Sequence, residues 1–182
     1  TAAAVERVRD KRIMTRLLRS TGLSTPRTVI CSPEGLADVD LEYPIIVKPV
    51  FGDNAEGLVV LDEPADLKRL RWRDSEVIVQ EYRPGSGVDF KLYVIDDFIA
   101  VRRPSPISRC TARSLGGVPV NDALRDIIKR VSAAFGLRFF GVDCLEVGGR
   151  LEVLEVNDFP NYSSVPNASE LLAEHVLRRA VA

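Results

Sequence analysis

The sequence predicts an α+β protein of two lobes, each with a small sheet and helices on one face, and with a cleft between the lobes. Three observations support this fold class. Short β-branched segments alternate with amphipathic helical segments along the 182 residues. A turn rich in Pro and Gly at residues 83–87 separates two halves of similar design. A chain of this length, 46% hydrophobic, can bury one core or two small ones. We therefore expect lobes at 1–84 and 85–182.

The N-terminal half begins with a helix and continues with short strands. Asp10 can cap a helix that begins at Lys11 and ends at Gly22, because its carboxylate accepts backbone N–H groups left free in the first turn. Residues 2–9 form either a helical extension or a frayed terminus. The other expected elements are strands at 28–30, 43–50, 58–61 and 76–82, and short helices at 33–39 and 66–72.

The C-terminal half contains two predicted hairpins and two helices. Residues 104–120 are rich in Pro, Ser and Gly, and we expect them to form a loop that covers a site. Asn121 and Gly136 delimit a strongly amphipathic helix. The other expected elements are a hairpin that pairs 90–95 with 98–103, a second hairpin at 139–157 and a last helix after residue 167.

The second hairpin places oxygen-bearing side chains on one face. If its connection is the three residues 148–150, Asp143 lies directly opposite Glu155. Asn157 then follows on the same face, because strand side chains repeat every two residues. A two-residue turn would pair Asp143 with Leu154 and mix the two faces, which the burial of one face disfavours. We therefore expect the three-residue connection.

This register has a consequence for each face of the hairpin. On the apolar face, it pairs Val142 with Val156 and Cys144 with Leu154. On the polar face, it brings together two carboxylates and an amide. Such hard oxygen ligands suit Mg²⁺, which binds one or two protein carboxylates and fills its other positions with water and substrate phosphates. The alternative is a solvent-exposed face, on which acidic residues have no ligand to bind.

A candidate phosphate site lies in the N-terminal half. Lys48 occurs inside a β-branched strand, where its side chain must either extend to solvent or face a ligand. The next segment, 51–57, is polar and has Gly at positions 52 and 57. Small residues let backbone N–H groups approach an anion. Residues 51–57 are therefore a candidate phosphate loop, with an ordinary turn as the alternative.

Composition narrows the classes of partner. The formal net charge is −1, which favours neither nucleic acid nor a membrane surface as a partner. No apolar run is long enough for a membrane span, and no signal peptide opens the chain, so we expect a cytoplasmic protein. The three cysteines have no metal-site spacing. Because the first residue is Thr1 and not Met, we expect that an N-terminal part is missing.

Seven motifs occur in a fixed order along nearly the whole chain. They are Asp10-Lys11, Gly22 to Thr28, Val47-Lys48-Pro49, the segment 51–57, Val79-Gln80-Glu81-Tyr82, Gly141-Val142-Asp143 and Leu154-Glu155-Val156-Asn157. In this order they resemble the ATP-grasp superfamily, which implies the ATP-grasp fold with a nucleotide between the lobes. The Gly pair at 116–117 is similar to carboxylate–amine ligases that add glutamate or other amino acids. Residues 90–94 and 101–105 are similar to the inositol-phosphate kinase branch.

The resemblance implies roles for individual residues. Lys11 and Lys48 would hold the triphosphate, because a lysine is a compact phosphate partner. Lys91 and Arg103, with Arg102 beside it, would supply positive charge to the transferring phosphoryl group or the second substrate. The remaining assignments are Gly52, Asp53 and Asn54 to the phosphates, Gln80, Glu81, Tyr82 and Arg83 to the purine, Asp89 to the ribose hydroxyls, and Asp143, Glu155 and Asn157 to Mg²⁺.

Most of these assignments have a plain structural alternative. Lys11 could be a first-turn helix residue that faces water. The purine segment could be an ordinary strand end, with Asp89 exposed beside it. Lys91 and Arg103 could be exposed strand charges. We expect the single histidine, His175, at the surface rather than in a catalytic role.

Three functions follow from the resemblance. The first is an ATP-dependent ligase that activates a carboxylate as an acyl phosphate and joins it to an amine or thiol. The second is a kinase of an inositol-phosphate-like substrate, and the third is an ATP-binding protein without turnover. All use ATP with Mg²⁺, or with Mn²⁺ as the alternative ion. We expect a small molecule or peptide as acceptor, and a homo-oligomer is compatible with the sequence. The resemblance also implies a preceding domain that contributes acceptor binding, and we expect that domain to be missing from the sequence.

Overall fold

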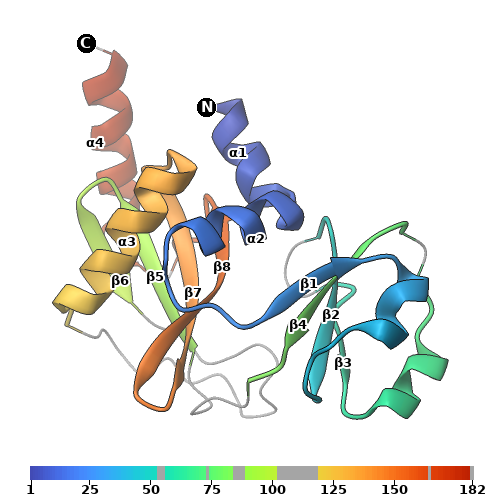
Figure 1. The fold of residues 1–182 in the computed structure, drawn as a ribbon. Coiled ribbons are helices and arrows are strands. Elements are labelled where there is room, and N and C mark those ends of the chain that lie inside the picture. Colours follow the sequence, from blue (N-terminus) through green and yellow to red (C-terminus); the bar gives the residue numbers. More distant parts are fainter. Residues whose placement is uncertain (53–55, 73, 84–88, 102–118, 164, 181–182) are drawn as a thin grey trace.

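The protein contains two four-stranded antiparallel sheets, each with its own helices (Figure 1). The computed structural model describes residues 1–52, 56–72, 74–83, 89–101, 119–163 and 165–180. This architecture confirms the α+β prediction. Among the described residues, none of the helices has the length and apolar character needed to cross a membrane.

The first sheet has the strand order β1-β4-β2-β3. Its apolar face packs on two 3₁₀ helices, Pro33–Asp38 and Pro64–Arg69. The second of these begins two residues before the predicted helix, because Pro64 starts it and the Asp66 carboxylate accepts the Glu63 N–H at 3.2 Å. The strands are β1 (Thr28–Cys31), β2 (Ile45–Pro49), β3 (Val59–Leu61) and β4 (Val77–Glu81).

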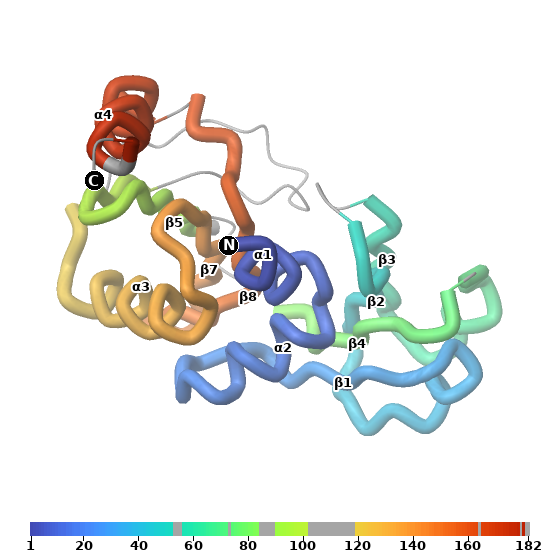
Figure 2. The backbone as a smooth tube through the Cα atoms, turned by 90° about the horizontal axis from the view of Figure 1, so that it is seen from above, coloured from blue at the N-terminus to red at the C-terminus, as the bar shows by residue number. Residues whose placement is uncertain are grey.

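The second sheet has the order β6-β5-β7-β8 and is covered on both faces. Along β5, Leu92 and Val94 face helices α1, α2 and α3, whereas Tyr93 and Ile95 face α4. Figure 2 shows α3 and α4 on opposite sides of β5 and β7. The elements are β5 (Asp89–Ile95), β6 (Phe98–Val101), β7 (Phe139–Val147), β8 (Arg150–Asp158), α3 (Asp122–Phe135) and α4 (Ala168–Ala180).

The first two helices pack with the second sheet, although they precede the first sheet in sequence. Helices α1 (Ala2–Arg9) and α2 (Lys11–Ser20) are joined by Asp10, whose side chain caps α2 as predicted. Their buried residues lie in the same core as Phe135 of α3 and Val142 of β7. The prediction placed the opening helix in the N-terminal lobe, residues 1–84. In the structure, this helix packs in the core of the second sheet, whose strands all lie after residue 84.

The β7–β8 hairpin has the predicted central pairing but a different turn. Asp143 lies opposite Glu155, and Val142 opposite Val156. The turn, however, contains only Gly148 and Gly149, since Val147 pairs with Arg150. Both glycines have positive φ, 57° and 77°, as a tight hairpin turn of this kind requires.

A β-bulge explains how a two-residue turn is compatible with this pairing. The register shifts by one residue between Asp143 and Cys144, so that Cys144 pairs with Val153 and Leu154 is the extra residue. The predicted pairing of Cys144 with Leu154 is therefore wrong. The bulge lets both Val153 and Val156 enter the core, while Leu154 and Glu155 both line the cleft described below.

The α3 side of the second sheet should dominate the stability of the C-terminal part. Phe135 is fully buried there, and we expect Phe135→Ala to lower the free energy of unfolding by about 3–5 kcal/mol, because it removes a large apolar side chain and leaves a cavity. Urea unfolding followed by circular dichroism measures this change. Leu177→Ala on the exposed side of α4 is the matched control, and an equal loss for both variants would contradict the assigned core.

Candidate functional site

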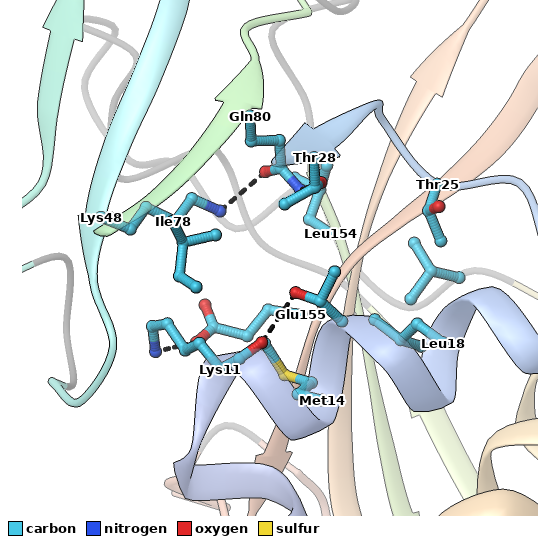
Figure 3. Close-up of a pocket in the computed structure, with 12 residues that line it drawn as sticks. Lys11, Met14, Leu18, Thr25, Thr28, Lys48, Ile78, Gln80, Leu154 and Glu155 are labelled. Atoms are coloured by element: carbon cyan, nitrogen blue, oxygen red, sulfur yellow. Dashed lines mark hydrogen bonds and ion pairs between the residues drawn. The ribbon is translucent and has the colours of Figure 1, made fainter. Parts of the chain in front are cut away.

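The candidate site is a cleft where the first sheet meets α2 and β8 (Figure 3). Charged and amide side chains form one part of its wall, namely Lys11, Lys48, Gln80 and Glu155. Apolar side chains and three threonines form the rest. The cleft brings together four of the predicted site residues, which come from four different elements. Its lining consists of Lys11, Met14, Thr15, Leu18, Thr25, Thr28, Lys48, Ile78, Gln80, Val153, Leu154 and Glu155.

Lys11 joins the first sheet to the β7–β8 hairpin. Its backbone N–H donates to the Val50 carbonyl at 3.1 Å, at the end of β2. Its Nζ donates to the Gly52 carbonyl at 2.9 Å and to Glu155 Oε1 at 2.7 Å. Lys11 is buried, so its position is inconsistent with a first-turn residue that faces water. Gly52 has a φ of 150°, a backbone conformation that favours glycine.

Lys48 is held by a neutral partner. It lies opposite Ile78 on β4, and the next β4 residue on the same face is Gln80. Lys48 Nζ donates to Gln80 Oε1 at 2.8 Å. Gln80 Nε2 in turn donates to Thr28 Oγ1 at 3.0 Å, across the β1–β4 pair. Thus the lysine faces the cleft rather than the solvent.

Burial lowers the pKa of Lys48 below its ordinary value, because the charged form loses hydration. The Glu155 and Asp143 carboxylates oppose this shift, while the positive charge of Lys11 adds to it. An anion bound in the cleft would favour the ammonium form and would therefore reverse the effect of burial. Such a lysine is suited to an anionic ligand.

The acidic residues of the hairpin form a second polar group beside the cleft. Asp143 and Glu155 are directly opposed on β7 and β8. Asn157 Nδ2 donates to Asp143 Oδ2 at 2.8 Å, and Lys91 Nζ lies 3.5 Å from Asp143 Oδ1. Each carboxylate therefore has one lysine, since Lys11 contacts Glu155. The hairpin prediction placed these three oxygen-bearing residues correctly relative to one another.

Gly141 makes room for Lys91. It lies opposite Asn157 on β8 and opposite Tyr93 on β5. A Cβ atom at this position would be 3.2 Å from Lys91 Cε and 3.1 Å from Pro160 Cγ, closer than side chains normally approach. The glycine thus leaves room for the stem of Lys91, which lies directly opposite Asp143 in the β5–β7 pair.

The donor set fits Mg²⁺. Two carboxylates and an amide oxygen on one strand pair are hard ligands of the kind this ion binds. Among the described residues, no three His, Cys, Asp or Glu side chains are close enough to hold a metal by themselves. The set therefore suits an ion that completes its coordination with water and phosphate oxygens rather than one held in a cage of protein ligands.

The predicted purine segment divides into two parts. Gln80 points into the cleft, whereas the Glu81 carboxylate is buried and pairs with Arg83 at 2.6 Å. The backbone N–H of Glu81 donates to the Arg27 carbonyl, and that of Tyr82 donates to the Pro44 carbonyl. A purine edge would therefore have to use the carbonyl groups or the N–H of Arg83.

Several predictions lie outside the described residues or rest on side chains that are not described. Asp53, Asn54, Arg102 and Arg103 belong to the first group. Asp89 is the first residue of β5, but only its backbone is described. Their assigned roles remain predictions.

Sequence reasoning missed Thr28 and Leu154 and misplaced His175. Thr28 could have been found from the pairing of β1 with Gln80, but only with the strand order known. Leu154 enters the cleft through the bulge, which had no local sequence signal. His175 is partly buried rather than freely exposed, because its side chain is 13% exposed and its Nδ1 contacts Asp96 Oδ2.

Comparison with known proteins agrees with this geometry. Residues 8–177 match the family described as RimK-like ATP-grasp domain. The chain is 24% identical to inositol-tetrakisphosphate 1-kinase 3 of Arabidopsis thaliana, over 80% of this chain and 50% of that protein. It is 25% identical to a probable alpha-L-glutamate ligase of Pasteurella multocida, over 92% of this chain and 58% of that protein. The chain thus spans little more than half the length of these curated relatives.

A solved structure shows the same fold. The ATP-grasp ligase PsnB, in complex with a minimal precursor, Mg and ADP, superposes with a TM-score of 0.67 at 26% identity. The match covers 94% of this chain and 60% of the PsnB chain. These similarities confirm the ATP-grasp fold that the order of motifs had indicated. The chain therefore belongs to the RimK-like ATP-grasp domain family.

Proposed function

We propose that this chain forms the nucleotide and metal site of an ATP- and Mg²⁺-dependent ligase, which activates a carboxylate and joins it to an amine or thiol. The convergence of Lys11, Lys48 and Glu155 in one cleft is the observation that carries this proposal. A triphosphate carries several negative charges, which two lysines and a carboxylate-bound metal ion between the two sheets could neutralise. A glutamate ligase and a precursor-bound ligase among the similar proteins support the ligase class.

The two lysines would act differently on the phosphates. Lys48 contacts a neutral amide oxygen, so its charge remains available to phosphate oxygens. Lys11 contacts the Glu155 carboxylate, and we infer that this lysine exchanges the carboxylate for a phosphate oxygen when the nucleotide binds. Glu155 is then left to bind the metal together with Asp143 and Asn157. Bound Mg²⁺ would neutralise charge on the phosphates and orient the γ-phosphoryl group.

In the proposed reaction, a carboxylate oxygen of the donor attacks the γ-phosphorus, and the bond to the β–γ bridging oxygen breaks to give an acyl phosphate and ADP. The amine or thiol of the acceptor then attacks the acyl carbon, loses its proton, and inorganic phosphate leaves. Lys91, beside Asp143, would stabilise negative charge on the group in transfer. Arg103 is proposed for the same task on sequence grounds.

A kinase is the second candidate, because inositol-tetrakisphosphate 1-kinases are also among the similar proteins. In that reaction an inositol hydroxyl oxygen, rather than a carboxylate oxygen, would attack the γ-phosphorus. The nucleotide and metal site would be the same. The two candidates therefore differ in the acceptor, whereas Lys11, Lys48 and Glu155 are proposed to bind the nucleotide and its metal in both cases.

Removal of either carboxylate of the proposed metal site should impair both catalysis and nucleotide binding. For Asp143→Asn and for Glu155→Gln, we expect turnover to be abolished and the affinity for a non-hydrolysable ATP analogue with Mg²⁺ to fall by at least about tenfold, about 1.4 kcal/mol. The reason is the loss of an anionic ligand from a site with only two. Isothermal titration calorimetry measures the affinity.

Glu146→Gln is the matched control for these variants. Glu146 lies on the same strand as Asp143, opposite Leu151 and closer to the turn. It undergoes the same chemical change but is absent from the proposed ligand set, so binding should stay within about twofold of the parent, about 0.4 kcal/mol. Normal turnover in Asp143→Asn and Glu155→Gln would contradict the metal assignment.

The acceptor class can be identified by ADP release. We expect ADP release to depend on amino acids or peptides supplied as pools, because the proposed chemistry needs a carboxylate and an amine. A coupled assay of ADP measures it. Stimulation by pools of inositol phosphates alone would favour the kinase, and tight ATP binding without stimulation by any pool would favour a non-catalytic ATP-binding protein.

A further inference from the structure

Thr28, Gln80 and Lys48 form a chain of hydrogen bonds across the first sheet. Thr28 Oγ1 lies 2.9 Å from the Pro26 carbonyl oxygen. Gln80 Nε2 lies 3.0 Å from Thr28 Oγ1, and Gln80 Oε1 lies 2.8 Å from Lys48 Nζ. Thr28 and Gln80 are buried, with 5% and 8% of their surfaces exposed. The chain therefore begins in the protein interior and ends at an ammonium group that faces the cleft (Figure 3).

The direction of every hydrogen bond in this chain is set by the Pro26 carbonyl. A carbonyl oxygen can only accept, so the Thr28 hydroxyl must donate its single proton to it. The Thr28 oxygen can then only accept from Gln80, which obliges the amide to present its NH₂ group to Thr28. The amide oxygen consequently points toward Lys48. The opposite amide orientation would place two donors, the NH₂ group and the Lys48 ammonium, against each other.

We propose that Thr28 and Gln80 are positioning residues that hold the Lys48 ammonium toward the nucleotide phosphates without cancelling its charge. This inference rests on the proposed nucleotide site. Neither residue needs to touch the reacting atoms. We call this chain of hydrogen bonds from Thr28 through Gln80 to Lys48 the relay. The sequence prediction assigned Gln80 to purine binding, whereas in the relay Gln80 orients Lys48.

The contrast with Lys11 supports this role. Lys11 contacts a carboxylate at 2.7 Å, so its charge is compensated by Glu155 until a ligand takes that place. The partner of Lys48 in the described part of the chain is an uncharged amide oxygen. Glu155, Lys11 and Asp143 act on Lys48 through their charges rather than by a hydrogen bond. Lys48 is thus the cation that can attract an incoming anion first.

An acceptor at Lys48 is also needed because the lysine is partly buried. Burial lowers its pKa, and an acceptor bonded to the ammonium opposes that change by favouring the charged form. If the Gln80 oxygen turned away, the pKa of Lys48 would fall further. The lysine would then lose its charge, and the site its affinity for phosphate, at a lower pH.

Conservative changes at Thr28 test the relay. Thr28→Val keeps the shape of the side chain but removes the hydroxyl that fixes the Gln80 amide, and Thr28→Ser keeps the hydroxyl. We expect Thr28→Val to weaken binding of a non-hydrolysable ATP analogue with Mg²⁺ by about tenfold, the scale of one hydrogen bond to a charged group. Thr28→Ser should bind like the parent. Calorimetry over a range of pH measures these constants.

Two further variants separate positioning from simple folding effects. Gln80→Met removes the amide at similar volume and should match Thr28→Val. Thr21→Val is the matched control, because Thr21 is not among the residues that line the cleft and its hydroxyl donates to a backbone carbonyl, that of Leu18. The titration of Lys48, followed by NMR of ¹³Cε-labelled lysine, should move to lower pH in Thr28→Val and Gln80→Met but not in Thr21→Val. Circular dichroism verifies that each variant is folded.

The outcomes distinguish the relay from the proposed function. If the parent protein binds the nucleotide, and folded Thr28→Val binds it equally well with an unchanged Lys48 titration, the relay is wrong and the nucleotide site stands. If the parent protein does not bind the nucleotide, the proposed function fails and the relay fails with it. A tenfold loss that Thr28→Ser restores, together with the shifted titration, supports the relay.

Discussion

The contact between Lys11 and Glu155 is the constraint on which the rest of the site depends. Lys11 is the first residue of α2, which packs in the core of the second sheet. Its backbone and side chain also bond to Val50 and Gly52, which directly follow β2 of the first sheet. One buried residue therefore joins the first sheet to the β7–β8 hairpin of the second sheet. Because its side chain has little freedom, the distance between the residues proposed to bind phosphate and those proposed to bind the metal is set by the fold itself.

Two of the three lysines of the site are paired with carboxylates before any ligand binds, whereas Lys48 bonds to the neutral amide of Gln80. Lys11 pairs with Glu155, and Lys91 lies beside Asp143. An unpaired charge in such a partly buried place would be costly. A nucleotide with its metal can enter by exchange, in which the phosphates take the lysines and the metal takes the carboxylates. In this account, the same four side chains stabilise the unliganded cleft and bind the ligand.

The sequence predicted the parts of this site that depend on short-range pattern. The pairing of Asp143 with Glu155 followed from keeping one hairpin face apolar, and the cap at Asp10 from the first turn of a helix. The turn length was wrong, because the bulge at Leu154 compensates for a two-residue turn and leaves no local signal. The Thr28 contact was not predictable either, since it depends on β1 and β4 being neighbours although more than 40 residues of chain separate them.

Anomalous diffraction from crystals grown with a non-hydrolysable ATP analogue and Mn²⁺ would test the central claim most directly. Mn²⁺ prefers the same oxygen ligands as Mg²⁺, and its anomalous signal identifies its position without assumption. The account predicts a Mn²⁺ peak at Asp143, Glu155 and Asn157, with the triphosphate between Lys11 and Lys48 and the contact from Lys11 to Glu155 broken. A nucleotide bound elsewhere, or a Mn²⁺ peak away from this hairpin, would contradict it.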